Sequence, residues 1–179
     1  MTTKTIVLAL GILMAACSGP GLRASAQSAP SGTACVGGEW WGDDEVARYG
    51  SCASVDGDLV LHDVSSLGPL AALRRVDGAL RIEHTTRLYS LSGLERLASV
   101  ERLELIDNRG LISVSGLKNL EHAPRVVIRQ NQRLSGSFGF LQRLNRTATD
   151  LRIERSAGLE AEGISALAPR TDDVILAAR

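Results

Sequence analysis

A short aliphatic pattern that recurs along the chain constrains its fold more than any other feature. Two aliphatic residues separated by one variable residue occur in six copies, at offsets of 21, 23, 23, 25 and 23 residues. A regular period in the low twenties is typical of a chain that winds into stacked coils. A single coil cannot bury its apolar edge, whereas stacked coils share one continuous core. The six triplets lie at 59–61, 80–82, 103–105, 126–128, 151–153 and 174–176.

The remainder of each unit is also periodic. Apolar residues three apart at 88–100 and 111–120 predict an inward stripe on a 3₁₀-like or short helical segment. We therefore predict an α/β solenoid over residues 59–179. It has about six leucine-rich coils of 21–25 residues, with a parallel β-sheet on one face and short helical or 3₁₀ segments on the other. Three further positions recur. A leucine lies six residues after the triplet (Leu67, Leu88, Leu111, Leu134, Leu159), and a glycine marks a bend (Gly68, Gly93, Gly116). A third position holds a short polar side chain that can bond adjacent coils in four units (Thr85, Asn108, Asn131, Ser156) and a valine in the first (Val64).

The first residues of the chain have the pattern of an export signal. Lys4 precedes an apolar run at 6–16, which suits a signal peptide and is too short for a membrane-spanning helix of about 20 residues. Residues 14–17, Met-Ala-Ala-Cys, resemble a bacterial lipobox, in which the cysteine is lipidated and becomes the new N-terminus. This resemblance predicts a signal peptide at 1–16 and a lipid anchor on Cys17.

The residues after the lipobox bear on where the exported chain resides. Ser18 is not the aspartate that typically retains lipoproteins at the inner membrane, so the resemblance implies the bacterial outer membrane or the cell surface. Cleavage after Ala26, which would release a freely secreted chain without lipid, is the alternative. Residues 17–34 are rich in Ser, Ala, Gly and Pro and predict a flexible tether. No later stretch is long and apolar enough to cross a membrane, so we expect membrane attachment through the lipid alone.

The two remaining cysteines predict a disulfide. In an exported protein, Cys35 and Cys52 are most simply cross-linked to each other. Sixteen residues lie between them, so the cross-link would stabilise the fold by roughly 3 kcal/mol on a loop-entropy model. A zinc site is the rival interpretation, but two cysteines with no nearby histidine are a poor ligand set. We expect residues 35–58 to form a disulfide-bonded N-terminal cap.

Two segments carry a resemblance to a known family. Residues 52–61 read Cys-Ala-Ser-Val-Asp-Gly-Asp-Leu-Val-Leu, and residues 76–82 read Val-Asp-Gly-Ala-Leu-Arg-Ile. On these motifs the chain resembles the leucine-rich repeat superfamily, and more closely the Receptor L domain, the ligand-binding solenoid of insulin- and epidermal-growth-factor-type receptors. The resemblance covers about residues 35–179. The chain departs from the family in having one cysteine pair and no cysteine-rich module, and it lacks a kinase or transmembrane segment, so receptor signalling is not implied.

The solvent-facing positions of the predicted sheet supply a candidate binding face. Neighbouring coils lie about 4.8 Å apart, so residues at equivalent positions can touch. One interpretation is a self-neutralised ladder of ion pairs that keeps the sheet soluble, each exposed pair contributing about 0–1 kcal/mol. The other is a polar docking face for a protein or a glycan, although this face has no aromatic anchor. The expected opposite-charge neighbours are Arg81 with Glu104, Arg125 with Asp150, and Arg129 with Glu154, and the candidate binding residues are Arg81, Glu83, Arg102, Glu104, Arg125, Arg129, Arg152 and Glu154.

Two adjacent tryptophans lie between the cysteines. We expect Trp40 and Trp41 to cover the open first coil, because the terminal units of a solenoid need a cap. Their alternative role is an exposed aromatic contact or a sugar-stacking platform. The acidic residues at 43–45 lack the ligand spacing of a calcium loop and predict the start of a solvated turn or helix.

Residues with catalytic or metal-binding chemistry are sparse. His62, Glu83 and His84 would lie on adjacent coils, but without a fixed ligand spacing we expect a plain solvent-facing pair and no metal. No nucleophile elbow, phosphate-binding loop or zinc-protease motif occurs, and the scattered carboxylates show no sign of a desolvated pocket. We therefore expect no catalytic residue, no enzyme activity and no cofactor.

These observations together predict a binding function. Twenty basic and twenty acidic residues leave no net charge, which argues against a nucleic-acid partner. We expect a non-catalytic recognition module of an exported lipoprotein that binds a protein or glycan at the cell envelope. The alternative is a structural envelope component. After the triplet at 174–176 only three residues follow, and such an uncapped solenoid end would favour self-association or assembly with a partner.

Overall fold

The computed structural model describes residues 32–135, 139–144, 148–156 and 174–177, with side chains placed through residue 156. The predicted signal peptide, the lipidation at Cys17, the alternative cleavage after Ala26 and most of the tether lie outside these residues. Among the helices that are described, none combines the length and the apolar character needed to span a bilayer.

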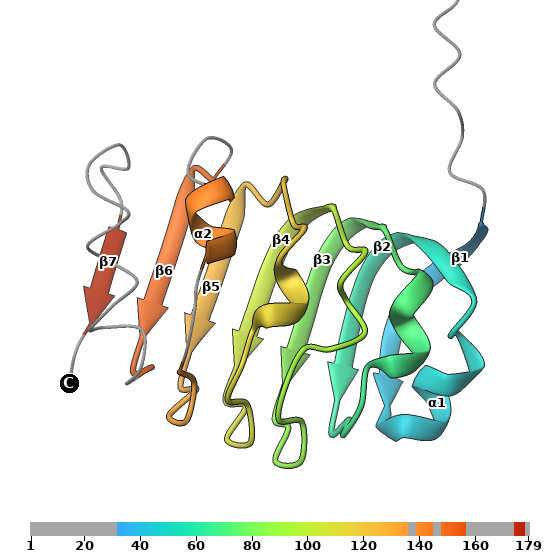
Figure 1. Ribbon diagram of the computed structural model, residues 1–179, viewed down its shortest axis with the longest axis horizontal. Coiled ribbons are helices and arrows are strands. Elements are labelled where there is room, and N and C mark those ends of the chain that lie inside the picture. Colours follow the sequence, from blue (N-terminus) through green and yellow to red (C-terminus); the bar gives the residue numbers. More distant parts are fainter. Residues whose placement is uncertain (1–31, 136–138, 145–147, 157–173, 178–179) are drawn as a thin grey trace, which may run out of the picture.

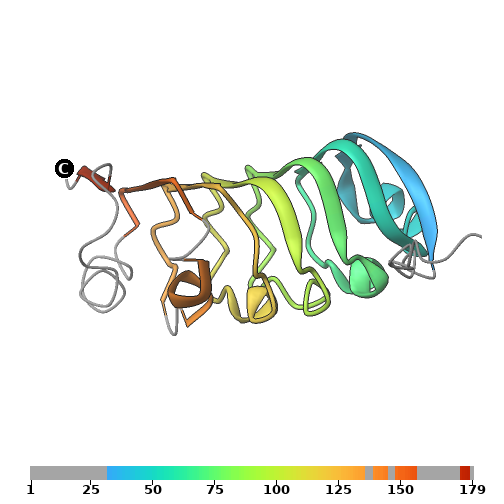
Figure 2. The same cartoon turned by 90° about the horizontal axis from the view of Figure 1, so that it is seen from above.

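The described residues form one parallel β-sheet with few helices, which is an α/β architecture (Figure 1). Seven strands follow one another in chain order, and each pairs in parallel with the next. The described connections between β2 and β5 return over one face of the sheet (Figure 2). The strands are β1 (Thr33–Trp41), β2 (Cys52–His62), β3 (Arg75–Glu83), β4 (Ser99–Ile106), β5 (Arg125–Arg129), β6 (Asp150–Glu154) and β7 (Val174–Ala177).

The six aliphatic triplets pair with one another in register, as their spacing predicted. Leu80 is paired with Leu59 on one side and with Leu103 on the other, and the same register continues through β7. Leu80 and Ile82 are fully buried, whereas Arg81 between them is partly exposed. The alternation arises because successive side chains on a strand point to opposite faces. One face of the sheet therefore belongs to the core and the other meets solvent.

The return segments cover the core face with short helices or turns. Leu91, Leu94 and Leu97 are fully buried. Two successive turns are closed by backbone hydrogen bonds, the first from Leu94 N to Leu91 O (3.1 Å) and the second from Leu97 N to Leu94 O (3.0 Å). These bonds span three residues, which confirms the predicted inward stripe. The helical elements are α1 (Gly42–Arg48), η1 (Gly68–Ala72), η2 (Ser115–Leu117) and α2 (Gly139–Leu144).

A ladder of buried polar side chains joins adjacent units where the chain leaves each strand. Asn108 Oδ1 accepts bonds from the Thr85 amide (3.2 Å) and hydroxyl (2.9 Å), and its Nδ2 donates to the Ile82 carbonyl (2.9 Å). Asn131 repeats the arrangement one unit later, accepting from the Asn108 amide (3.0 Å) and donating to the Leu105 carbonyl (2.9 Å). The bonding role predicted for these positions is confirmed.

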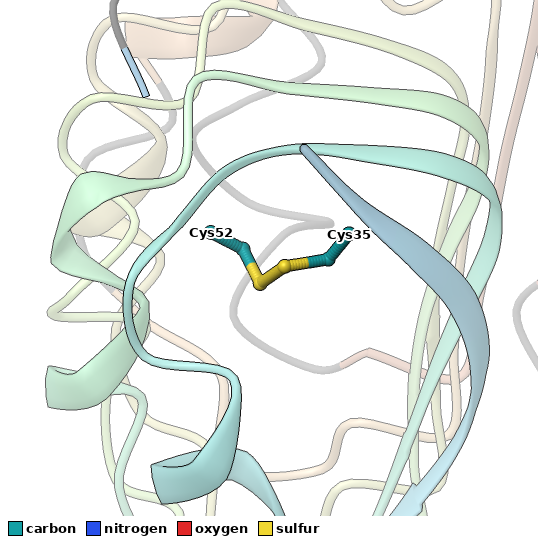
Figure 3. Close-up of a disulfide and its surroundings, with 2 residues drawn as sticks. All are labelled: Cys35 and Cys52. Carbon is teal, nitrogen blue, oxygen red and sulfur yellow. A yellow bond between two sulfur atoms is a disulfide. The ribbon is translucent and has the colours of Figure 1, made fainter. Parts of the chain in front are cut away.

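The sheet begins earlier than the sequence analysis predicted. Thr33 and Ala34, assigned to the tether, are the first residues of β1, and the predicted cap at 35–58 contains the rest of β1, the helical turn at 42–48 and the first residues of β2. The disulfide between Cys35 and Cys52 is confirmed (Figure 3), and it joins β1 to the start of β2 across a Cα–Cα distance of 5.8 Å. The cross-link therefore holds the first strand against the second.

The acidic residues at 43–45 lie in the first turn of α1, as expected of a solvated helix start. Asp43 also ties α1 to the loop after β2, because its carboxylate accepts bonds from the Ser65 amide (2.7 Å), the Ser65 hydroxyl and the Ser66 amide (3.2 Å). The hydrogen bonds from Ser65 lower the pKa of Asp43.

We expect Asp43→Asn to lower the free energy of unfolding at pH 7 by about 0.5–1 kcal/mol, a modest loss because the site is exposed. A lowered pKa in the folded state means that the stabilisation is complete above the unfolded pKa of about 3.9 and fades as the pH falls through the folded value. Urea unfolding at neutral and strongly acidic pH, with Asp44→Asn as the control, measures this. An equal loss at both pH values would contradict the assignment.

Candidate functional site

The solvent face of strands β3 to β6 carries a hollow of about 430 Å³. All eight residues of the predicted binding face line it, so the solvent-facing positions chosen from the repeat lie around one hollow. Five of the lining residues are arginines and four are carboxylates. The full lining consists of Arg81, Glu83, Arg102, Glu104, Ile106, Arg125, Val127, Arg129, Asp150, Arg152 and Glu154.

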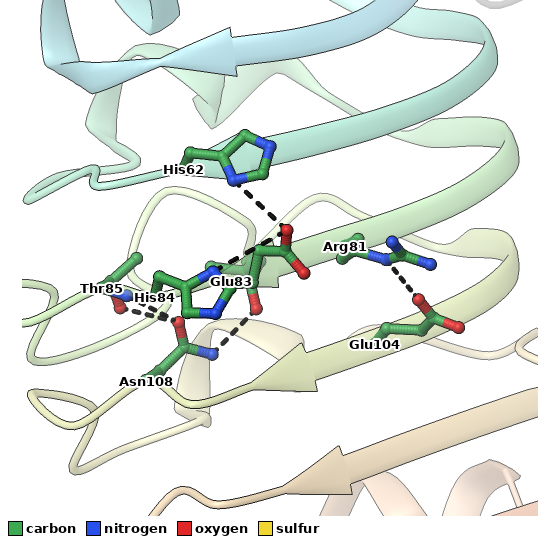
Figure 4. A network of polar contacts seen from close by, with 8 residues as sticks. His62, Arg81, Glu83, His84, Thr85, Glu104 and Asn108 are labelled. Atoms are coloured by element: carbon green, nitrogen blue, oxygen red, sulfur yellow. Dashed lines mark hydrogen bonds and ion pairs between the residues drawn. The ribbon is translucent and has the colours of Figure 1, made fainter.

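Glu104 is a lining carboxylate that contacts two arginines, Arg81 and Arg102. Its residue is only 7% exposed, and its Oε2 lies 2.5 Å from Arg81 Nε on the neighbouring strand (Figure 4). Arg102 Nη1 lies 3.5 Å from the other carboxylate oxygen, Oε1. The hydrogen bond to Glu104 raises the pKa of the Arg81 guanidinium above its ordinary value. The expected pairing of Arg81 with Glu104 is therefore confirmed.

The two other predicted ion pairs are not formed, although their residues are neighbours in register. Asp150 is paired with Arg152 on its own strand at 3.1 Å. Residues two apart on a strand share a face, so the long side chain of Arg152 can reach Asp150 as well as a cross-strand partner could. Among the described residues, neither Arg125 nor Arg129 forms an ion pair, and both are exposed.

Arg102 and Arg125 occupy directly paired positions on β4 and β5. Like charges directly opposite one another on a sheet are destabilising. Of these two arginines only Arg102 lies near Glu104, so Arg125 has no ion-pair partner in the described part of the chain. Among the described residues that line the hollow, two arginines, Arg125 and Arg129, and one carboxylate, Glu154, therefore form no ion pair, which leaves an excess of positive charge.

The two tryptophans have different roles. Trp40 is 3% exposed and stacks on Tyr49 with ring centroids 4.2 Å apart, which agrees with the capping role and excludes it as a surface contact. Trp41 is 60% exposed and stacks on His62 at 4.1 Å, on the solvent face. The expectation that this face lacks an aromatic residue is wrong. The sequence held a signal for this position of Trp41. Trp40 is paired with Leu61, 21 residues later, and the same offset separates the first two triplets.

The structure brings His62, Glu83 and His84 together at the end of β2 and β3 (Figure 4). His62 is 7% exposed, so the expected solvent-facing pair is wrong for this residue. Trp41 of β1 covers its ring, and the sequence analysis did not predict that strand. Glu83 lines the hollow as well, which places the cluster beside it.

Comparison with models of protein families found no match to this chain, and comparison with curated proteins found none. The function is therefore argued from the site itself.

Proposed function

We propose that this chain is a leucine-rich, Receptor-L-like solenoid that serves as a non-catalytic recognition module of an exported lipoprotein. Its strand face binds a protein or glycan at the cell envelope. One observation carries the proposal: the eight polar residues chosen from the repeat line a single hollow on the solvent face. Solenoids commonly present such extended surfaces to their ligands.

The charge distribution in the hollow favours a ligand that carries carboxylates. Arg125 and Arg129 have no ion-pair partner among the described residues, and the lining carboxylates include one that is likewise unpaired, Glu154, whereas Glu104 and Asp150 are paired. A guanidinium presents a planar fork of donors that matches a carboxylate in two parallel bonds. An acidic peptide and an acidic glycan share this chemistry, and both are ligands of the kind proposed.

Two further observations support the solenoid and its export. Strands in chain order, joined by a ladder of buried polar side chains, suit stacked repeats better than an arrangement of independent elements. The disulfide is of a kind that persists in oxidising compartments. Self-association through residues 174–176 stays a prediction, because the described residues include no side chain of β7.

We expect the wild-type protein to bind an oligoglutamate peptide or an oligogalacturonate more tightly than a neutral peptide or a maltooligosaccharide. The double reversal Arg125→Glu/Arg129→Glu should weaken that binding by about tenfold or more, because it replaces two uncompensated positive charges by negative ones. Isothermal titration calorimetry at low and physiological salt measures both effects, and the difference should shrink as salt screens the charges.

Arg96→Glu is the matched control, since Arg96 is an exposed arginine on the return segment between β3 and β4. It should leave binding unchanged. The proposal fails if neither acidic probe binds better than its neutral counterpart, or if Arg96→Glu weakens binding as much as the double reversal does. The peptide and glycan arms show which source of carboxylate the hollow prefers.

A further inference from the structure

Three side chains with metal-ligating atoms converge beside the hollow. One such atom from each of His62, Glu83 and His84 lies within 4.8 Å of the other two. His62 Nδ1 is 3.3 Å from Glu83 Oε1, and His84 Nδ1 is 3.8 Å from the same oxygen (Figure 4). We propose that these residues form a binding site for a divalent transition-metal ion such as Zn²⁺. The proposal reverses the expectation of no metal and is independent of the proposed function.

The backbone explains why consecutive residues reach the same point. Glu83 ends β3, and successive side chains on a strand would normally point to opposite faces. His84 has a left-handed backbone with φ of 56°, which breaks this alternation and brings its imidazole to the carboxylate of Glu83. The residue at this position is left-handed in the neighbouring units too, at Asp63 and Asp107. The bend therefore belongs to the fold, and the histidine is what is particular to this unit.

The spacing of the ligating atoms suits zinc. Zinc–nitrogen and zinc–oxygen bonds of about 2.0–2.1 Å in a tetrahedron place two ligand atoms about 3.4 Å apart. The separation of 3.3 Å between His62 and Glu83 already matches this edge. The side chain of His84 is 62% exposed, so a small rotation can close its longer separation. Two imidazoles and one carboxylate leave a fourth position for water or for a ligand atom.

The carboxylate of Glu83 has no arginine or lysine ion-pair partner among the described residues, and a bound metal ion would supply the missing positive charge. The Glu83 side chain is only 16% exposed, and no arginine or lysine among the described residues forms an ion pair with it. His62 Nδ1 is the ring nitrogen that faces Glu83 and would bind the ion, whereas Nε2 is buried without a hydrogen-bond partner. Here the ring is held by stacking on Trp41 and by Glu83 alone.

The test is a titration of Zn²⁺ alone into the full chain carrying Cys17→Ser. This background leaves no free thiol, because the two other cysteines form the disulfide. We expect saturation at one equivalent of Zn²⁺ by calorimetry, and much weaker binding of Mg²⁺ and Ca²⁺, which prefer oxygen ligands. Co²⁺ should give the visible spectrum of a bound ion and quench the fluorescence of Trp41, which stacks on a ligand.

His84→Ala and Glu83→Gln should each raise the Kd for Zn²⁺ at least about tenfold. His84→Ala is the decisive variant, because an exposed side chain can be removed without disturbing the core. His122→Ala is the matched control, since the chain has three histidines and this one lies outside the cluster. Absence of one-equivalent binding, unchanged affinity in His84→Ala, or loss of binding in His122→Ala would each overturn the proposal.

Discussion

Replacing Asn108 by alanine is expected to lower the free energy of unfolding by about 3–5 kcal/mol. Asn108 and Thr85 are completely buried, and the substitution removes the partner of the Thr85 amide, the Thr85 hydroxyl and the Ile82 carbonyl at once. Each buried polar group left without a partner costs about 1–3 kcal/mol. Urea unfolding followed by far-ultraviolet circular dichroism measures the loss.

Asn119→Ala provides the comparison for this prediction. Asn119 also donates its side-chain amide to a backbone carbonyl, that of Glu95 at 2.6 Å, but it does so in an exposed position. Water replaces the lost bond there, so we expect a decrease of about 1 kcal/mol or less. A similar loss in both variants would show that the buried ladder contributes no more than an exposed amide.

Gly93→Ala is expected to lower the free energy of unfolding by about 2–6 kcal/mol. Gly93 has a φ of 110°, which side-chain-bearing residues rarely adopt. A Cβ at this position would lie 2.0 Å from the carbonyl oxygen of Leu67 on the preceding unit. The backbone of one unit would have to move away from the next, so strain and overpacking add. Thermal and urea unfolding both measure the effect.

Gly68→Ala is the control for the bend, because Gly68 begins the η1 segment of the preceding unit, one position before the residue that aligns with Gly93. A Cβ there would meet only the Ser66 hydroxyl at 3.4 Å, so we expect a change of about 0.5 kcal/mol or less. Equal losses of stability at Gly68 and Gly93 would contradict the claim that the loss at Gly93 comes from its close approach to the Leu67 carbonyl. Gly116, whose Cβ would lie 1.8 Å from the Leu91 carbonyl, should behave like Gly93.

The repeat made much of the sheet predictable. A triplet that recurs at nearly constant spacing fixes which residues become neighbours, and the observed register follows it from β2 to β7. The polar slot and the recurring glycines were predictable for the same reason, because each unit repeats the same local environment. The eight candidate binding residues could be chosen from this register, and all of them line the hollow.

The first strand was not predicted, because Gly38 stands where the other units have an aliphatic residue. Because β1 was not predicted, two residues of the site were also placed wrongly. Without β1, Trp41 could not be placed on the solvent face, and His62 was expected to be exposed. Two of the three expected ion pairs, those of Arg125 and Arg129, were wrong for a different reason: register gives the distance between strands, whereas side-chain rotamers select among the partners within reach.

Sequence alone was sufficient for properties that depend on repetition: the triplets, their pairing, the polar ladder and the residues that share one face. These follow from backbone periodicity, which is local and short-ranged. Tertiary structure decided which charges stay unpaired and which imidazole is buried. It also decided whether two histidines reach one carboxylate. Those outcomes depend on how side chains pack between strands, because the left-handed backbone at His84 recurs at Asp63 and Asp107 and so belongs to the repeat, whereas the contacts of its imidazole do not.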